Sequence, residues 1–340
     1  MPQHITTIPA ASAAAYEAAR HRAAAIDRSG RGRIVVSGGD RASYLQGLLT
    51  NDVVALKTGQ GCYAAYLNAQ GRMIADLHVY ELGDVMLLTM AGEVKDAVLA
   101  RLDQFIFSED VQLGDVTDAF AQLAVIGPQA AQPLATVLGS ISVETLQAMQ
   151  EHGNLRTDWQ GSPAIVARVT DTGEPGYDLF VDRGRHAALA EALRAAGVVE
   201  ADAAIADAIR IEGGVPLFHR DMDETTIPLE ANLESRAISF SKGCYVGQEV
   251  VIRVLHRGHG RVARKLVGLL VDGDSVPPPG TTIRSAEREI GAVTSSTRSP
   301  ALGRPIALGY VHRDFVEPGT SVTVGDASAT VTALPFVSGS

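Results

Sequence analysis

A run of strand-like segments early in the chain constrains the fold most strongly. Residues 61–67 have the composition of a strand, and residues 72–80 form a second strand that returns beside it. The four residues between them, 68–71, end in a glycine, which suits a tight turn because glycine adopts conformations that other residues avoid. Residues 85–89 supply a third strand. The segment therefore predicts an antiparallel meander of three strands.

Three polar residues alternate along the second of these strands. Asp76, His78 and Tyr80 are each two positions apart. Successive side chains of a strand point to opposite faces, so these three share one face. Two interpretations stay open. The face points to solvent, which the pattern alone favours, or it lines a polar pocket.

The remaining segments alternate between helical and strand-like patterns. An alanine-rich stretch predicts a helix over 10–26, and Asp40 is a good N-cap for a helix over 41–49. Pro128 is expected at the first position of another helix. Further helices are predicted over 93–107, 186–196 and 202–212, and further strands over 33–38, 111–113, 121–126, 165–170 and 177–181. Short strands separated by Pro- and Gly-rich turns after residue 265 predict a small β-barrel or jelly roll.

Length and charge limit the classes of protein. A chain of 340 residues is long enough for two or three domains. Its formal net charge of −10 argues against a broad nucleic-acid-binding surface, which needs a basic footprint. Basic residues do gather locally between Arg253 and Lys265. This basic run is either a charged strand edge or a face for an anion or a partner.

The cysteines and the N-terminus indicate the compartment. Two cysteines, Cys62 and Cys244, are too few for a disulfide scaffold and suggest reduced thiols. No cysteine or histidine spacing matches a zinc site, so we expect no bound metal. The N-terminus has no charged segment followed by a long apolar run, and no apolar run reaches about 18 residues. We therefore expect a cytoplasmic protein without a membrane span.

Chemically versatile residues are densest in 242–249, Lys-Gly-Cys-Tyr-Val-Gly-Gln-Glu, which Arg253 follows. Gly243 and Gly247 flank the cysteine and let the backbone turn tightly or approach a ligand. The charge of Lys242 could favour the thiolate of Cys244, which is the reactive form. The alternative is a structural turn in which the cysteine is only a small buried side chain.

This signature resembles that of the YgfZ-type folate-binding proteins, relatives of the glycine-cleavage T-protein that are implicated in iron–sulfur cluster assembly or repair. The likeness extends from about residue 20 to the C-terminus. It implies an α+β fold of T-protein type, in which two interwoven α/β subdomains with antiparallel sheets and a C-terminal β-barrel surround a central folate channel. The implied division is 1–240 for the folate-binding body, 241–262 for the signature and connection, and 263–340 for the barrel.

The resemblance also implies a site for tetrahydrofolate. The T-protein's Gly-Gly-x-x-Asp-Asp-Leu segment matches 71–77, where its catalytic aspartate is kept as Asp76, while Ala75 replaces the first aspartate. Met90 stands where the T-protein has an asparagine. Cys244 joins Asp76 as a candidate catalytic residue. The folate contacts implied by the resemblance are Tyr63, Asp76, Tyr80, Glu174, Tyr177, Arg210 and Lys242.

Three functions follow from these residues. The first is a tetrahydrofolate-binding protein that supports iron–sulfur enzymes or cluster-assembly proteins, with Cys244 as nucleophile, one-carbon acceptor or transient cluster ligand. The second is a folate-dependent aminomethyltransferase, in which Asp76 binds the folate and steers its attacking nitrogen. The third is an interaction scaffold with an empty channel, whose partner face is the basic run. The signature favours the first, and whether a reaction is catalysed stays open.

Overall fold

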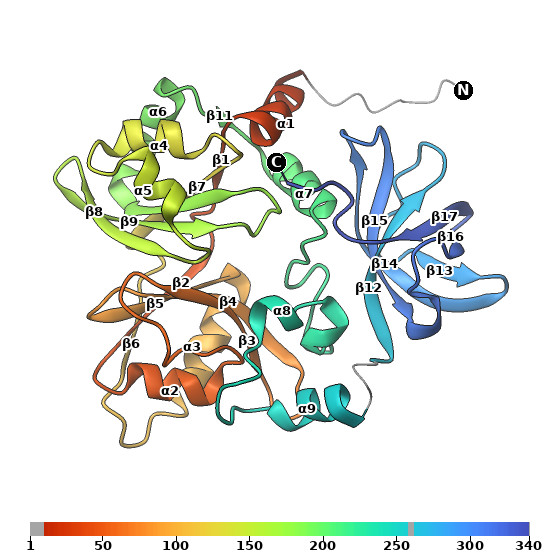
Figure 1. The fold of residues 1–340 in the computed structure, drawn as a ribbon, viewed down its shortest axis with the longest axis horizontal. Helices are drawn as coiled ribbons and strands as arrows, with labels where there is room; N and C mark the ends of the chain where they lie inside the picture. Colours follow the sequence, from red (N-terminus) through yellow and green to blue (C-terminus); the bar gives the residue numbers. More distant parts are fainter. Residues whose placement is uncertain (1–9, 258–261, 340) are drawn as a thin grey trace.

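The computed structural model describes residues 10–257 and 262–339, which form three lobes (Figure 1). Two lobes are built on β-sheets, at the left of the view, and the third is the barrel at the right. The described part confirms the predicted α+β fold with antiparallel sheets and a C-terminal barrel. None of its helices is long and apolar enough to cross a membrane.

The first sheet has six strands in the order β11-β1-β7-β10-β9-β8. Its strands are β1 Ala24–Asp27, β7 Phe120–Ile126, β8 Asn154–Trp159, β9 Ser162–Val169, β10 Gly176–Asp182 and β11 Val199–Glu200. The helices α4 Ala131–Leu138, α5 Val143–Ala148 and α6 His186–Ala195 cover one face (Figure 1). Apolar side chains of β7 and β10 alternate toward these helices and form one core.

The second sheet is the predicted meander, extended by two strands to the order β3-β4-β5-β2-β6. Its strands are β2 Gly32–Ser37, β3 Gly61–Leu67, β4 Met73–Glu81, β5 Val85–Met90 and β6 Gln112–Asp115. The helices α2 Arg41–Leu48 and α3 Lys95–Asp103 pack on its apolar face. The turn at 68–71 carries Gly71 in a left-handed conformation, with a φ of 71°, as the sequence predicted.

The two sheets are interwoven along the chain. Strand β1 belongs to the first sheet, strands β2 to β6 form the second, and β7 returns to the first. The chain therefore crosses between the sheets at residues 28–31 and again at residues 116–119. These two short connections bring the uncovered faces of the sheets together, because no long linker separates them.

The barrel closes without a free edge, in the strand order β12-β15-β14-β13-β16-β17. Its strands are β12 Arg264–Val271, β13 Thr282–Ser285, β14 Arg288–Ser299, β15 Arg304–His312, β16 Ser321–Val324 and β17 Ala327–Thr332. Helices α1 Ala10–His21 and α7 Ala203–Glu212 lie beside the first sheet (Figure 1), and α7 packs against β14 and β15 of the barrel. The division of the chain into domains at 240 and 262 stays a prediction.

Several local expectations were wrong. The first helix ends at His21, and residues 24–27 form a strand, because the segment pairs with β7 and β11 in spite of its alanines. The Asp40 side chain does not cap α2 but accepts a hydrogen bond from the backbone N–H of Asp110. Pro128 lies in the turn before α4 rather than in its first turn.

The signature segment is an irregular stretch that leads into the helix α9 Gln248–Arg257, which the sequence did not predict. Its Gly247 has a φ of 83° and packs on the β3–β4 turn, where a Cβ atom would lie 2.5 Å from the carbonyl oxygen of Asn68. The signature is thus folded against the second sheet. Part of the predicted basic run, residues 258–261, lies outside the described residues.

Lys242 caps the C-terminal end of α2. Its buried ammonium donates hydrogen bonds to the backbone carbonyls of Gln46, Leu49 and Asn51, at 2.7, 2.6 and 2.9 Å. These carbonyls have no partners within the helix, and the C-terminal end of a helix attracts positive charge. Burial lowers the pKa of Lys242 to about 8, which the charge of Asp52 opposes. The lysine is therefore a capping group for α2.

We predict that Lys242→Met lowers the free energy of unfolding on the order of 3 kcal/mol, because it leaves buried carbonyls without donors. Equilibrium unfolding in urea measures the loss. Lys57→Met, at an exposed position in the loop that precedes β3, is the control and should change stability little. Equal stability of the two variants would contradict the capping role.

Candidate functional site

The site lies on the face of the second sheet that α2 and α3 leave uncovered. Paired positions place Tyr63 of β3, His78 of β4 and Thr89 of β5 side by side, with Arg33 of β2 next in the row. Tyr80 and Asp76 lie on the same face, two residues to either side of His78. The predicted sharing of one face by Asp76, His78 and Tyr80 is confirmed, but the face is buried against the first sheet rather than exposed to solvent.

This face changes character along the strands. Around Tyr80 the contact between the sheets is apolar and includes Leu87, Ala167 and Phe180. Toward Asp76 it becomes polar. The fully buried hydroxyl of Tyr80 and that of Thr89 have no hydrogen-bond partner among the described residues. Buried polar groups are normally paired, so unpaired ones mark a place where a ligand or water belongs.

Asp76 is the carboxylate at the polar end. Its Oδ2 accepts a hydrogen bond of 2.7 Å from the hydroxyl of Tyr63. Burial raises the pKa of Asp76 above its usual value, whereas the hydrogen bond from Tyr63 and the charge of Arg31 act in the opposite direction. Such a carboxylate is held in a fixed orientation and is a stronger base than an ordinary aspartate.

Two histidines face one another beside Asp76. The rings of His78 and His152 lie 5.2 Å apart, and His78 lies 5.2 Å from the ring of Tyr63. His152 reaches this place from the loop before β8 with a φ of 61°, and its carbonyl would clash with any side chain at position 61. Burial lowers the pKa of His78 well below the usual value and that of His152 to about 4, so both rings are neutral at pH 7.

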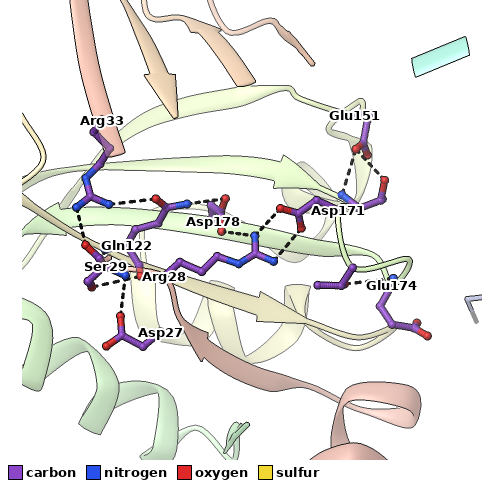
Figure 2. A network of polar contacts seen from close by, with 11 residues as sticks. Asp27, Arg28, Ser29, Arg33, Gln122, Glu151, Asp171, Glu174 and Asp178 are labelled. Atoms are coloured by element: carbon purple, nitrogen blue, oxygen red, sulfur yellow. Dashed lines mark hydrogen bonds and ion pairs between the residues drawn. The ribbon is translucent and has the colours of Figure 1, made fainter. Parts of the chain in front are cut away.

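A buried ion-pair network borders the histidines on the side of the first sheet (Figure 2). The guanidinium of Arg28 donates two parallel hydrogen bonds of 2.8 Å to Asp171 and one of 3.1 Å to Asp178. Paired contacts of this kind are strong and directional. The charge of Arg28 keeps the pKa of Asp171 below its usual value despite burial, whereas burial raises the pKa of Asp178.

The network continues through Gln122 to Arg33. Gln122 donates to Asp178 at 2.9 Å and accepts from Arg33 at 3.2 Å (Figure 2). Arg33 also donates to the backbone carbonyls of Ser29, Thr117 and Phe120. Arg33 therefore connects both crossings between the sheets. It follows Tyr63, His78 and Thr89 in the row across the sheet, and its role there is structural.

A cavity of about 780 Å³ opens next to this network, which is large enough for a cofactor-sized molecule. Its lining includes Arg28, Arg31 and Asp171, and also Arg210 and Phe218. The cavity and the polar face of the second sheet are neighbours, since Asp171 lines the cavity and also interacts electrostatically with His78 of that face.

The structure places three of the predicted folate contacts away from Asp76. Glu174 is fully buried and pairs with Arg20 of α1, and its carboxylate points away from the Arg28 network in Figure 2. Tyr177 faces the helices of the first sheet, and Arg168 donates to its hydroxyl at 2.7 Å. Arg210 lines the cavity but is held by other groups. Their roles toward folate stay predictions.

Arg210 ties α7 to the barrel. It donates to Asp207 and Asp221 at 2.6 and 2.7 Å, and to the hydroxyl of Ser295 in β14 at 2.8 Å. Cys244, by contrast, is exposed, and no hydrogen bond described for it joins it to Asp76 or Tyr63. The ammonium of Lys242 serves α2 rather than this thiol. The structure thus brings Tyr63, Asp76 and Tyr80 together, but not Cys244 and Lys242 with them.

Sequence reasoning missed Arg28, Arg236, His152 and Asp171 as parts of the site. Arg236 stacks on Tyr63, with 5.5 Å from its guanidinium carbon to the ring centre. These residues come from loops and element ends with no motif of their own, and only the meeting of the two sheets brings them to Asp76. The described residues hold no group of three or more histidine, cysteine or carboxylate side chains that could bind a metal ion.

The chain is therefore a three-lobed protein built from two interwoven sheets and a closed barrel. Its candidate site is the face around Asp76, with a cavity next to it. Residues 2–242 match the model of the GCVT N-terminal domain, and residues 264–338 match that of the glycine cleavage T-protein C-terminal barrel domain. The chain belongs to the glycine cleavage T-protein family.

Related sequences align with this chain over nearly its whole length. The chain is 33% identical to an aminomethyltransferase of Streptomyces coelicolor, over 94% of this chain and 88% of the relative. It is also 33% identical to one of Rubrobacter xylanophilus, over 95% and 85%. The crystal structure of the glycine cleavage system aminomethyltransferase T from Bartonella henselae superposes with a TM-score of 0.88 at 26% identity, over 98% of this chain and 91% of that one.

These comparisons correct the first functional hypothesis. The signature at 242–249 favoured a protein of iron–sulfur cluster assembly or repair, but the relatives are named aminomethyltransferases. The structure offers a reason why the signature misled. Lys242 and Gly247 are used to anchor the segment on α2 and on the β3–β4 turn. The family assignment holds, and the iron–sulfur function does not.

We predict that His152 makes the protein sensitive to acid. Its pKa of about 4 lies below the unfolded value near 6.5, so the unfolded state binds a proton first as the pH falls. The stability that depends on a neutral His152 is fully present above the unfolded pKa of about 6.5 and is lost as the pH falls below it. Between pH 7 and pH 5, His152 lowers the free energy of unfolding by about 2 kcal/mol.

The test compares His152→Asn with the original protein by urea unfolding at both pH values. Asparagine tolerates the left-handed backbone of this position, and the variant should lose correspondingly less stability on acidification. His186→Asn, at a more exposed site, is the matched control. An unchanged loss in His152→Asn would show that the ring is not buried in its neutral form.

Proposed function

We propose that this chain is a folate-dependent aminomethyltransferase. The observation that supports this most is the buried carboxylate of Asp76, oriented by Tyr63 at the polar end of a face beside a large cavity. The relatives that match nearly the whole chain are named aminomethyltransferases, which agrees with this proposal. The same arrangement would be costly in a mere scaffold, because burying a carboxylate without a full set of partners is unfavourable.

The residues present fit tetrahydrofolate. A reduced pterin offers hydrogen-bond donors and acceptors on a flat ring. The face beside Asp76 offers polar atoms of Tyr80, His78 and Thr89 that have no partner among the described residues, and the ring of His78 contacts those of Tyr63 and Tyr80. When bound, tetrahydrofolate would supply the nitrogen that accepts a one-carbon unit. Tyr63, His78 and Tyr80 would bind the ring, and the apolar contact behind Tyr80 limits how deeply it enters.

In this proposal Asp76 is the general base or the hydrogen-bond acceptor that orients the attacking nitrogen. Its carboxylate accepts a proton from the attacking nitrogen or orients that nitrogen by a hydrogen bond, and its raised pKa suits a general base. Tyr63 donates to one carboxylate oxygen and so leaves the other for the reacting group. The enclosing sheets exclude bulk water from the carboxylate, which strengthens both interactions.

Within the family, we further propose that the chain belongs to the YgfZ-type branch. The support is the sequence of residues 242–249 alone. This grouping concerns descent and adds no second reaction to the proposed one.

We predict that Asp76→Asn reduces aminomethyl transfer about 100-fold to 10,000-fold, because an amide cannot accept the proton. The assay supplies an aminomethylated lipoyl carrier protein and tetrahydrofolate. The rate of the original protein should fall as the pH drops through the raised pKa of Asp76, and the variant should lose this dependence. Asp84→Asn, at an exposed position on the β4–β5 turn, should be fully active.

Tetrahydrofolate binding is measured separately by anaerobic calorimetry. We expect saturable binding to the original protein, and weaker binding to Tyr80→Leu, which removes the unpartnered hydroxyl while keeping an apolar side chain. Absence of binding to the original protein would contradict the proposal and favour an interaction scaffold. Full transfer activity in Asp76→Asn would contradict the role of this residue.

A further inference from the structure

The short helix α8 Glu234–Ala237 is joined to β3 by two side chains of the loop that follows α2. The buried hydroxyl of Thr50 accepts a hydrogen bond of 2.8 Å from a backbone N–H of β3 and donates one of 2.6 Å to the last carbonyl of α8. Asn51 donates to the carbonyls of Tyr63 and Arg236, at 2.9 and 3.4 Å. The backbone of Arg236 therefore has a fixed position beside Tyr63.

The side chain of Arg236 adds a contact with the tyrosine ring. Its guanidinium carbon lies 5.5 Å from the centre of the Tyr63 ring. A cation is attracted to the electron-rich face of an aromatic ring. The hydroxyl at the end of this ring donates to Oδ2 of Asp76 at 2.7 Å. The tyrosine is thus held at its face by Arg236 and at its hydroxyl by Asp76.

The cation also acts on the tyrosine hydroxyl. Burial and the charge of Asp76 raise the pKa of Tyr63, and the charge of Arg236 acts in the opposite direction. A hydroxyl that gives up its proton more readily donates a stronger hydrogen bond to a carboxylate. A donor of this kind favours the charged form of Asp76.

Asp76 has charged or titratable neighbours on several elements, and they are Tyr63 of β3, His78 of β4, Arg236 of α8, Arg31 of the crossing at 28–31 and His152 of the loop before β8. Burial raises the pKa of Asp76, whereas the hydrogen bond from Tyr63 and the charges of both arginines oppose this rise. The histidines are neutral at pH 7 and add no charge. The loss of Arg236 therefore acts in one direction, toward a higher pKa of Asp76.

We propose that Arg236 is a positioning residue for the transfer reaction, and that it acts on Asp76 by holding the ring of Tyr63. The inference rests on the proposed aminomethyltransferase function and adds a residue to its machinery. In this role Arg236 acts through the tyrosine and requires no contact with folate or with the one-carbon donor. Without the cation the ring can turn away from Oδ2, and Asp76 loses the orientation that transfer requires.

The first experiment follows the titration of Asp76 in the absence of substrates, by carbon NMR of protein isotopically labelled at its aspartate carboxyl carbons. Asp76→Asn identifies the signal. We expect Arg236→Gln to raise the pH at which Asp76 titrates by about half a unit to one unit, because the carboxylate loses a well-held donor. The matched control is Arg288→Gln, which removes a guanidinium 5.6 Å from the ring of Phe315 in the barrel and should leave the titration unchanged.

Tyr63→Phe decides whether the arginine acts through the tyrosine. This change keeps the ring and removes the hydroxyl, so it should itself raise the pH at which Asp76 titrates. In the Tyr63→Phe background, Arg236→Gln should then shift the titration by about a third or less of the shift that it causes alone. Additive shifts would overturn the positioning role, as would an unchanged titration in Arg236→Gln.

Transfer kinetics supply the second measurement. We expect Arg236→Gln to lower kcat about tenfold and to change the KM for tetrahydrofolate less than about threefold, because the orientation of Asp76 suffers more than binding does. Arg236→Lys keeps a cation over the ring and should restore kcat to within about threefold of the original protein. A raised KM with unchanged kcat would contradict a positioning role.

The two measurements separate this inference from the proposed function. An original protein that transfers no aminomethyl group overturns the proposed function, whereas the titration requires neither folate nor carrier and still tests Arg236. Should Arg236→Gln fail to fold, Arg236→Met replaces it, because methionine keeps a long side chain over the ring without a charge. An Asp76 that titrates in Arg236→Met as it does in the original protein would overturn the inference.

Discussion

The guanidinium of Arg28 is the interaction on which the rest of the structure depends. It lies where the chain leaves the first sheet for the second, and it holds Asp171 and Asp178 at once. Five residues further on, Arg33 binds the carbonyl of Thr117 in the other crossing and that of Phe120 at the start of β7. Both crossings between the sheets are thereby held in place. Removing one partner of such a buried pair typically costs about 3–5 kcal/mol, so the spacing of the sheets is firmly set.

This rigid spacing makes a polar site possible between two sheets. The apolar contact around Tyr80 and Phe180 closes one end of the interface. At the other end the sheets cannot collapse onto Asp76 and His78, because the Arg28 network occupies the space between them. The unpaired hydroxyls and imidazole nitrogens are a cost in stability that a site for a ligand would explain.

Some features could be predicted from the residues alone, and others depended on distant partners. The antiparallel meander, the shared face of Asp76, His78 and Tyr80 and the closed barrel all follow from alternation and turn residues, which are local properties. The helical prediction for residues 24–26 failed because strand pairing outweighed the propensity of alanine. The interpretation of Lys242 as a group that activates Cys244 considered neighbours in sequence, whereas its actual partners are some 190 residues away.

The sequence by itself determined the family, the types of element and the place of Asp76 on a strand, because strand periodicity and a matched motif are written in consecutive residues. Only the tertiary structure decided what surrounds that carboxylate. Arg28, His152, Asp171 and Arg236 come from four separate segments, and nothing local marks any of them. It also decided which arginines are paired, since Arg210 binds Asp221 while Arg31 has no ion pair to any of the residues that the structure describes. Pairing and burial are properties of three-dimensional contacts, and a linear pattern does not contain them.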